Sequence, residues 1–345
     1  MAGYREKFLR SVHFLGGTLS PKLLVNITNK RLIVPIYHAV SDAPIKHIKH
    51  LYKVKNVKEF TNDLDFLLKN FTPIDYDQLK TIIEEGTIPK KNSFILTFDD
   101  GLKEFYEVIS PILLKKGIPA ICFLNSDFID NKSLFFRYKA SLLLESFSVD
   151  KNLQTKIEVK NWIIKNSFGK KNELKQLILS ANYNNQQILD SLAKSIDLDF
   201  NEYLQNHEPY LNSIQIDELI KMGFFFGSHS CDHPEYQYLN LADQISQTEK
   251  SMAEISGKFG LKYNTFAFPF TDYGVSKKYF DQILKVKKSI DLSFGSAGLK
   301  NELYSNHIQR IPFEVGNLNA KEILNSEYLY YIIKFIFGKN TIFRK

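Results

Sequence analysis

Two adjacent aspartates, Asp99 and Asp100, stand at the end of an apolar run and are the first candidates for chemistry. They follow Phe94–Phe98 and precede Gly101. Successive side chains of a regular strand point to opposite faces, so both carboxylates can serve one site only where the strand ends and the backbone turns. Gly101 permits such a turn. A lone Asp-Gly more often caps a following helix, but an aspartate pair behind a strand favours a catalytic or metal-binding loop.

A pair of histidines, His229 and His233, follows a second apolar run, Phe224–Phe226. Two imidazoles four residues apart can approach one cation from a helical turn or a tight loop, and neutral imidazole with carboxylate oxygen is a ligand set typical of zinc. Alone, a His-x-x-x-His pair is more often a surface coincidence. Joined to the aspartate pair, it predicts an open metal site of one Asp and two His, with a position left for water.

Short apolar runs that predict buried strands alternate with stretches of helical periodicity. The helical pattern is clearest in residues 57–71 and 102–116, and Pro111 interrupts the second. The predicted strands are Leu32–Tyr37, Phe94–Phe98, Ala120–Leu124, Phe224–Phe226, Thr265–Phe270 and Ile308–Pro312. Strands that are apolar on both faces and alternate with helices indicate an α/β fold, with a parallel sheet that is closed as a barrel or left open.

Two parts of the chain depart from this alternation. Residues 130–209 are rich in Lys, Asn and Leu, poor in Gly, and lack a convincing strand, so we expect a helical insertion. Residues 1–30 are expected to form an N-terminal helical segment, and residues 31–345 one domain that carries the insertion.

The composition is that of a globular protein: 345 residues, 44% hydrophobic and 24% charged. Lys and Arg outnumber Asp and Glu by 45 to 38, which favours an anionic glycan or an acidic membrane surface, although solvated Lys on helix faces are the simpler interpretation. The basic residues are scattered and no motif of a nucleic-acid-binding domain is found, so nucleic acid is not expected as a partner. Cys122 and Cys231 suggest no disulfide framework.

Neither end of the sequence predicts a membrane span. The N-terminal apolar stretch is broken by Arg10 and His13, so no signal peptide is expected. The aromatic run Tyr328–Phe337 is too short to span a bilayer. We interpret it as a packed terminal helix, with an interfacial membrane contact as the alternative.

The motifs resemble those of the polysaccharide deacetylase family, also known as carbohydrate esterase family 4. Its signatures, a Thr-Phe-Asp-Asp-Gly strand end and a His-(Ser/Thr)-x-x-His loop, stand unaltered at Thr97–Gly101 and His229–His233. An aromatic-rich strand that ends in Pro and an aromatic residue resembles Phe266–Phe270. The resemblance covers residues 31–128 and 210–315, and it implies a distorted (β/α) barrel of about seven strands.

The resemblance also implies a role for each matched residue. Asp99 corresponds to the general base, Asp100 with His229 and His233 to the metal ligands, and the backbone N–H of Phe270 to an oxyanion donor. Amide hydrolysis suits this division, because a cation makes its water more acidic, a free carboxylate takes the proton, and the oxyanion needs the metal and a fixed N–H. The departing amine also requires a general acid.

One departure from the family concerns the residue that braces the base. Many members place an Arg just before the Pro of the third motif, where this chain has Phe268, and a Gly after it, where this chain has Thr271. Arg310 is predicted to supply the brace instead.

A second departure concerns the acid. The late Leu-x-x-His motif of the family has no counterpart here, because His307 follows Leu303 at the wrong spacing. Residues 35–40 resemble the early strand-end His of a subgroup that includes bacterial poly-N-acetylglucosamine deacetylases. We therefore predict His38 as the acid, with His307 as the alternative.

These expectations together describe a metal-dependent hydrolase that removes N-acetyl groups from a sugar or polysaccharide, with one divalent ion, zinc, as cofactor. A cytoplasmic or membrane-peripheral step on a glycan, free or lipid-linked, is expected. The alternatives are a non-catalytic glycan-binding descendant and a metal phosphohydrolase, which usually needs more ligands for two metals. A glycosidase would place its carboxylates about 5–10 Å apart and has no need of the two histidines.

Overall fold

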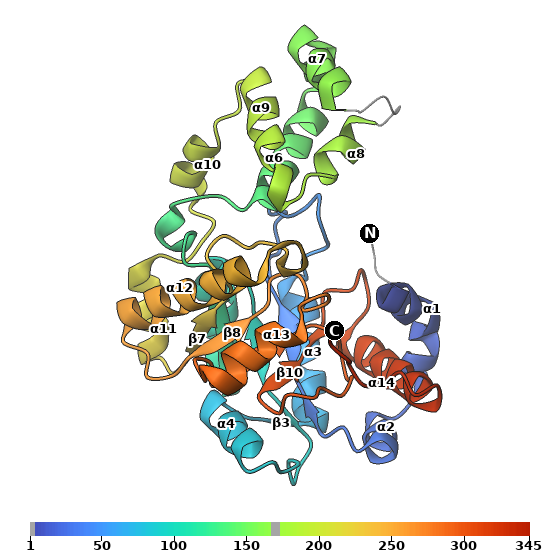
Figure 1. Ribbon diagram of the computed structural model, residues 1–345. Coiled ribbons are helices and arrows are strands. Elements are labelled where there is room, and N and C mark those ends of the chain that lie inside the picture. Colours follow the sequence, from blue (N-terminus) through green and yellow to red (C-terminus); the bar gives the residue numbers. More distant parts are fainter. Residues whose placement is uncertain (1–3, 167–172) are drawn as a thin grey trace.

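The centre of the computed structural model, which describes residues 4–166 and 173–345, is a parallel sheet rolled into a barrel (Figure 1). In the described residues the sheet has eight strand segments, and each pairs in parallel with its neighbour. Their order is β10 (His307–Gln309), β9 (Leu292–Gly295), β8 (Thr265–Ala267), β7 (Phe225–Ser228), β6 (Ala120–Leu124), β5 (Leu96–Phe98), β2 (Pro35–Tyr37) and β11 (Ile311–Pro312).

One broken strand closes the barrel. β10 pairs with β9 at one edge of the sheet, and β11 pairs with β2 at the other. Only Arg310 separates β10 from β11 in the sequence. The two edge segments are therefore halves of one strand position, and eight segments occupy about seven positions. The predicted α/β fold, a distorted barrel of about seven strands, is confirmed.

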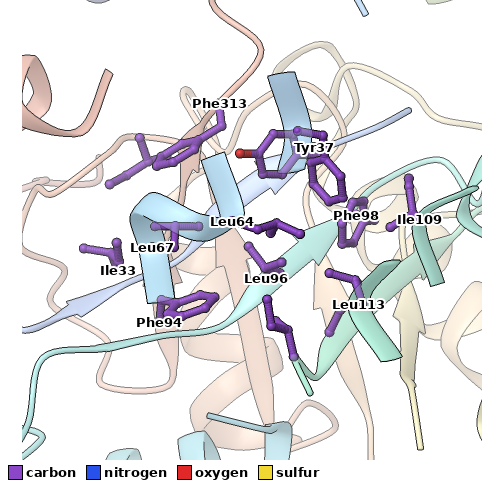
Figure 2. Packing of buried hydrophobic residues seen from close by; sticks show 14 of the residues in the cluster. Ile33, Tyr37, Leu64, Leu67, Phe94, Leu96, Phe98, Ile109, Leu113 and Phe313 are labelled. Carbon is purple, nitrogen blue, oxygen red and sulfur yellow. The ribbon is translucent and has the colours of Figure 1, made fainter. Parts of the chain in front are cut away.

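The strands are buried on both faces, as a parallel sheet covered by helices requires. On one side, Leu64 and Leu67 of helix α3 (Val57–Asn70) pack on Leu96 and Phe98 of β5 (Figure 2). Helix α3 begins at a capping box in which Asn56 and Glu59 satisfy each other's backbone N–H groups. A small outer sheet has the order β1 (Leu32–Ile33), β4 (Ser93–Phe94) and β3 (Thr72–Pro73). In the chain, β1 and β4 directly precede the barrel strands β2 and β5.

Pro111 leaves its mark on the helix that follows the aspartates. The chain forms a π-helix, η1 (Phe105–Ile109), before the α-helix α5 (Ser110–Lys116). Proline lacks an N–H and clashes with the carbonyl four residues earlier, so it is best accommodated in a first helical turn. The predicted interruption lies at the change from one helix type to the other.

The remaining helices form the outer layer. Around the barrel lie α4 (Tyr76–Glu84), α11 (Ser213–Lys221), α12 (Leu241–Phe259), α13 (Lys277–Phe280) and the π-helix η6 (Asp281–Val286). Short 3-10 turns are η2 (Ile129–Asn131), η3 (Lys151–Thr155), η4 (Tyr183–Asn185) and η5 (Tyr236–Tyr238).

Two further groups of helices lie apart from this layer (Figure 1). Five helices gather beyond one end of the barrel and share their own apolar core: α6 (Phe136–Val149), α7 (Ile157–Asn166), α8 (Leu174–Leu179), α9 (Gln187–Ser195) and α10 (Phe200–His207). At the side of the barrel, α1 (Tyr4–Thr18) and α2 (Pro21–Thr28) pack against the terminal helix α14 (Ala320–Ile336). Residues 1–3 and 167–172, which belong to the predicted N-terminal segment and insertion, lie outside the described residues.

Several details differ from the sequence-based expectation. The predicted strands Leu32–Tyr37 and Phe94–Phe98 are each divided into two segments that belong to different sheets. Strand β9 was not predicted, and the strand expected over Thr265–Phe270 ends at Ala267, where Pro269 breaks the ladder. None of the helices in residues 4–166 and 173–345 combines the length and apolar character needed to cross a bilayer.

Candidate active site

The aspartate pair sits on a left-handed turn at the carboxyl end of β5. The Asp99 N–H still donates to the Tyr37 carbonyl at 3.0 Å, and the backbone then turns, with φ of 71° at Asp100 and 62° at Gly101. A Cβ added at position 101 would lie 2.6 Å from a methyl carbon of Leu124, and it would also be strained by the positive φ. This turn is what allows two consecutive carboxylates to serve one site.

The two histidines approach the same oxygen of Asp100. The Nε2 atoms of His229 and His233 lie 3.7 Å and 3.3 Å from Asp100 Oδ1. The Nδ1 of His229 faces the Ala267 carbonyl at 2.8 Å, so it carries the proton and leaves Nε2 with a lone pair. Burial lowers the pKa of His229 to about 4, which keeps this ring neutral at pH 7.

The donor set of Asp100, His229 and His233 fits a divalent metal. One ligand atom from each residue lies within 4.8 Å of the others, and all three residues are buried. Within the described chain, Asp100 Oδ1 is buried and has no hydrogen-bond partner. A buried carboxylate oxygen without a donor is costly unless a cation occupies the space beside it. One oxygen and two imidazole nitrogens form an open ligand set suited to zinc.

Arg310 grips Asp99 with both terminal nitrogens. Its Nη1 donates to Asp99 Oδ1 at 2.7 Å and its Nη2 to Oδ2 at 2.9 Å, while its Nε donates to the Gly295 carbonyl at 3.1 Å. The guanidinium is buried and lies over the Phe123 ring. Burial opposes ionisation of Asp99, but the charge of Arg310 outweighs it and holds the pKa of that carboxyl below its usual range. The predicted contact between Arg310 and Asp99 is present.

His38 lies at the carboxyl end of β2 and pairs with Glu314. Its Nδ1 is 2.5 Å from Glu314 Oε2, and its ring lies beside that of Tyr52. Burial disfavours the charged ring, but Glu314, with smaller contributions from Asp100 and Asp99, raises the pKa of His38 to about 9. His38 is therefore cationic at pH 7 and lies in the field of the two aspartates.

Phe270 is held in an unusual backbone conformation next to the histidines. Its φ is 55°, and its ring packs edge-on against His233 with 4.6 Å between centroids. In the described part of the chain its N–H has no acceptor, whereas the next N–H, of Thr271, is bonded to the Pro269 carbonyl at 2.5 Å. Position 270 thus offers a free backbone donor at the site.

His307, the alternative acid, is committed elsewhere. Its Nδ1 contacts Ser293 Oγ at 2.8 Å and its Nε2 contacts Asp272 Oδ2 at 3.1 Å. The ring is fully buried beside Phe268, which fills an aromatic cluster instead of reaching the aspartates. The structure brings together Asp99, Asp100, His229, His233, Arg310, His38 and Phe270, but not His307.

The site contains side chains that the sequence did not point to. Tyr138 donates from α6 to Asp100 Oδ2 at 2.6 Å, and the Phe135 ring packs on His233 with 4.3 Å between centroids. Glu314 pairs with His38. Because these partners lie far apart in the chain, no local motif identified them; the aromatic cluster at 135–138 was the only available signal.

Comparisons with known proteins agree with this fold. The family's sequence model, described as "Polysaccharide deacetylase", matches residues 86–292. That match covers more than half of the chain, and the chain belongs to the polysaccharide deacetylase family. It is a polysaccharide N-deacetylase, a hydrolase that acts on C–N bonds other than peptide bonds. No curated protein matches it.

Several solved structures share the fold. The Streptococcus pyogenes deacetylase PplD, solved in complex with acetate, is 14% identical, with 86% of this chain and 97% of that chain covered and a TM-score of 0.54. IcaB from Ammonifex degensii is 15% identical over 86% and 97% of the two chains, with a TM-score of 0.52. BC0361, a polysaccharide deacetylase from Bacillus cereus, is 15% identical over 86% and 68%, with a TM-score of 0.50. At these identities the likeness concerns the fold alone.

Proposed function

We propose that this deacetylase is metal-dependent, with one divalent ion, assigned as zinc, held by Asp100, His229 and His233. The observation that carries the proposal is the unpartnered Asp100 Oδ1, which faces the Nε2 atoms of two buried imidazoles. When bound, the ion would supply Lewis acidity, which makes a water molecule more acidic and stabilises negative charge on oxygen.

Asp99 is the general base in this proposal. Its carboxylate is ionised at neutral pH because the positive charge of Arg310 stabilises the anion. Each oxygen keeps a further lone pair beyond its hydrogen bond to the guanidinium. Arg310 fixes both oxygens, so Asp99 can accept the proton of the attacking water without rotating. Such preorganisation lowers the cost of proton transfer at the moment of reaction.

The backbone N–H of Phe270 and the imidazolium of His38 complete the reaction. The N–H donates to the oxygen of the tetrahedral intermediate, because no other acceptor in the described chain occupies it. His38 donates a proton to the departing amine nitrogen. Glu314 keeps His38 protonated, since it raises the pKa of that ring to about 9.

The substrate in this proposal is an N-acetylated sugar or glycan, free or carried on a lipid, and the cell compartment is the cytoplasm. We divide the chain into an N-terminal helical segment (1–30) and a barrel domain (31–345) with a helical insertion (130–209). The insertion brings Phe135 and Tyr138 to the site, so it is our candidate for the wall that selects the glycan.

A peripheral membrane contact through the end of α14 is part of the same proposal. Phe335, Ile336 and Phe337 are 64%, 70% and 70% exposed, and Lys334 and Lys339 flank them. Exposed aromatic side chains with basic neighbours suit the surface of an anionic bilayer. Replacing Ile336 and Phe337 by Ser should abolish co-sedimentation with phosphatidylserine vesicles without changing turnover of a soluble substrate. Unchanged sedimentation would contradict the contact.

The test of the function is acetate release from a panel of N-acetylglucosamine oligomers and lipid-linked sugars. We expect Asp99→Asn to lower kcat by about 10²–10⁴-fold while zinc remains bound. Asp100→Asn should lose both zinc and turnover, and chelation of the wild type should be reversed by added zinc. Glycan binding without any acetate release would instead favour the non-catalytic descendant, and phosphate release from a phosphorylated sugar would favour the phosphohydrolase.

A further inference from the structure

Tyr138 is a buried side chain of α6 that makes a direct bond to the candidate metal ligand Asp100. Its ring is 1% exposed, and its hydroxyl lies 2.6 Å from Asp100 Oδ2. An ionised carboxylate has no proton, so the phenol must be the donor. At this distance the bond is a short, charge-assisted hydrogen bond of the stronger kind.

The two oxygens of Asp100 therefore have different partners. Oδ2 accepts from Tyr138, whereas Oδ1 faces the Nε2 atoms of His229 and His233 and has no donor in the described chain. Rotation of the carboxylate would break the phenol bond and turn Oδ1 away from the histidines. The hydroxyl of Tyr138 thus fixes which oxygen is presented to the ligand position, as outer partners of metal ligands do.

The aromatic packing around Tyr138 holds its ring in place. The ring contacts those of Phe135, His47 and Tyr210, with 5.1, 4.9 and 6.2 Å between centroids. Phe135, at the start of the same helix, packs on the ring of His233. The first turn of α6 therefore reaches two of the three candidate ligands, although it belongs to a group of helices with a core of its own.

We propose that Tyr138 is a positioning residue of the metal centre: its hydroxyl orients Asp100 so that Oδ1 meets the cation. This rests on the metal site proposed above. It gives the helical group α6–α10 a second role beside the proposed selection of the glycan, because the affinity of the barrel for its ion then depends on a side chain supplied from outside the barrel.

The test is the zinc affinity of Tyr138→Phe, which removes one hydroxyl and keeps the ring. Affinity is measured by competition with a chromophoric chelator, starting from the metal-free full chain. We expect the dissociation constant to rise by about 10- to 100-fold. The matched control is Tyr203→Phe, which removes a phenol hydroxyl of α10 that bonds His47 Nδ1 at 2.9 Å and does not touch Asp100. Its zinc affinity should equal that of the wild type.

A second measurement separates positioning from stability. A group that orients a metal ligand also changes the rise in melting temperature caused by zinc, because ligand stabilisation follows affinity. We expect metal-free Tyr138→Phe to melt somewhat below metal-free wild type, since the buried phenol–carboxylate hydrogen bond is lost, and its melting temperature to rise less on adding zinc. An unchanged zinc dissociation constant, or an equal loss of melting temperature with and without zinc, would overturn the role of Tyr138. A wild type that binds no divalent ion would instead refute the metal site itself, and this proposal with it.

Discussion

Two buried arginine–carboxylate clusters stand out among the residues that the structure describes, and they differ in which polar atoms they leave unpaired. In the first, Arg310 holds Asp99, and the neighbouring Asp100 keeps an oxygen without a donor. In the second, Arg344 bonds Asp272 at 2.6 Å and Glu302 at 2.5 Å, and it lies 3.8 Å from the centre of a Phe ring. Both clusters are almost fully buried.

The second cluster satisfies itself. Asp272 accepts from His307, Gln309 and Arg344, and none of the side chains of this group that the structure describes has an unpartnered buried polar atom. Its Asp, Glu and His atoms lie close enough for a metal, but a guanidinium already neutralises the carboxylates. Spacing alone therefore does not define a site; the unpaired oxygen of Asp100 distinguishes the first cluster from the second.

The largest expected difference between the two clusters is in acetate release after replacement of Arg310 or Arg344. Breaking a buried ion pair costs about 3–5 kcal/mol of unfolding free energy, so Arg310→Ala and Arg344→Ala should both lower the melting temperature. Only Arg310→Ala should abolish acetate release, with its zinc content intact, because only Arg310 holds Asp99. Turnover is compared at a temperature where circular dichroism shows both variants folded. Wild-type turnover in Arg310→Ala would contradict the role of Arg310 in holding Asp99 in position.

Replacement of His38 or His307 should distinguish the two clusters in the same way, with a smaller loss of activity. His38→Ala should lower kcat/KM by about 10²–10⁴-fold, as expected for loss of a general acid, with little change in stability. His307→Ala removes one hydrogen-bond partner from each of Ser293 and Asp272 and should cost about 1–3 kcal/mol of stability while turnover stays within a few-fold. Acetate release and thermal unfolding measure both. If only His307→Ala lost activity, His307 would be the acid.

The smallest expected effect is on the pH profile. The folded-state pKa of His38 is raised from 6.5 to about 9, so the ring is protonated below pH 9 and loses its proton above it. We expect kcat/KM to fall as the pH rises through about 9. Glu314→Gln removes the main group that raises this pKa, so the fall should begin at lower pH. An alkaline limb that does not move would show that another group is responsible.

Much of the barrel could be predicted because its strands carry their own signal. Runs such as Ala120–Leu124 are apolar on both faces, which follows directly from burial between helix layers. Strand β9 escaped prediction because Leu292–Gly295 is short, contains Ser293 and a glycine, and follows a lysine-rich segment. Its burial depends on neighbours that only the closed sheet supplies.

The centre of the site could be predicted because it is local in sequence. Asp99 and Asp100 are adjacent, and His229 and His233 are four residues apart, so each pair forms a motif. The role of Arg310 could be inferred because Phe268 stands where many family members have the arginine that contacts the base. Tyr138 and Glu314 could not, because each meets its partner only after distant segments pack, and periodicity contains no information on such contacts.

The broken strand at Arg310 also bears on how the chain folds. β11 pairs with β2, which comes from near the start of the barrel domain. Such contacts between distant segments form late, because a large loop must close before they gain anything. The residue at this seam is the one that grips Asp99. In a chain whose barrel is still open, Arg310 therefore does not yet hold Asp99. Deacetylase activity should appear only when β11 has paired with β2.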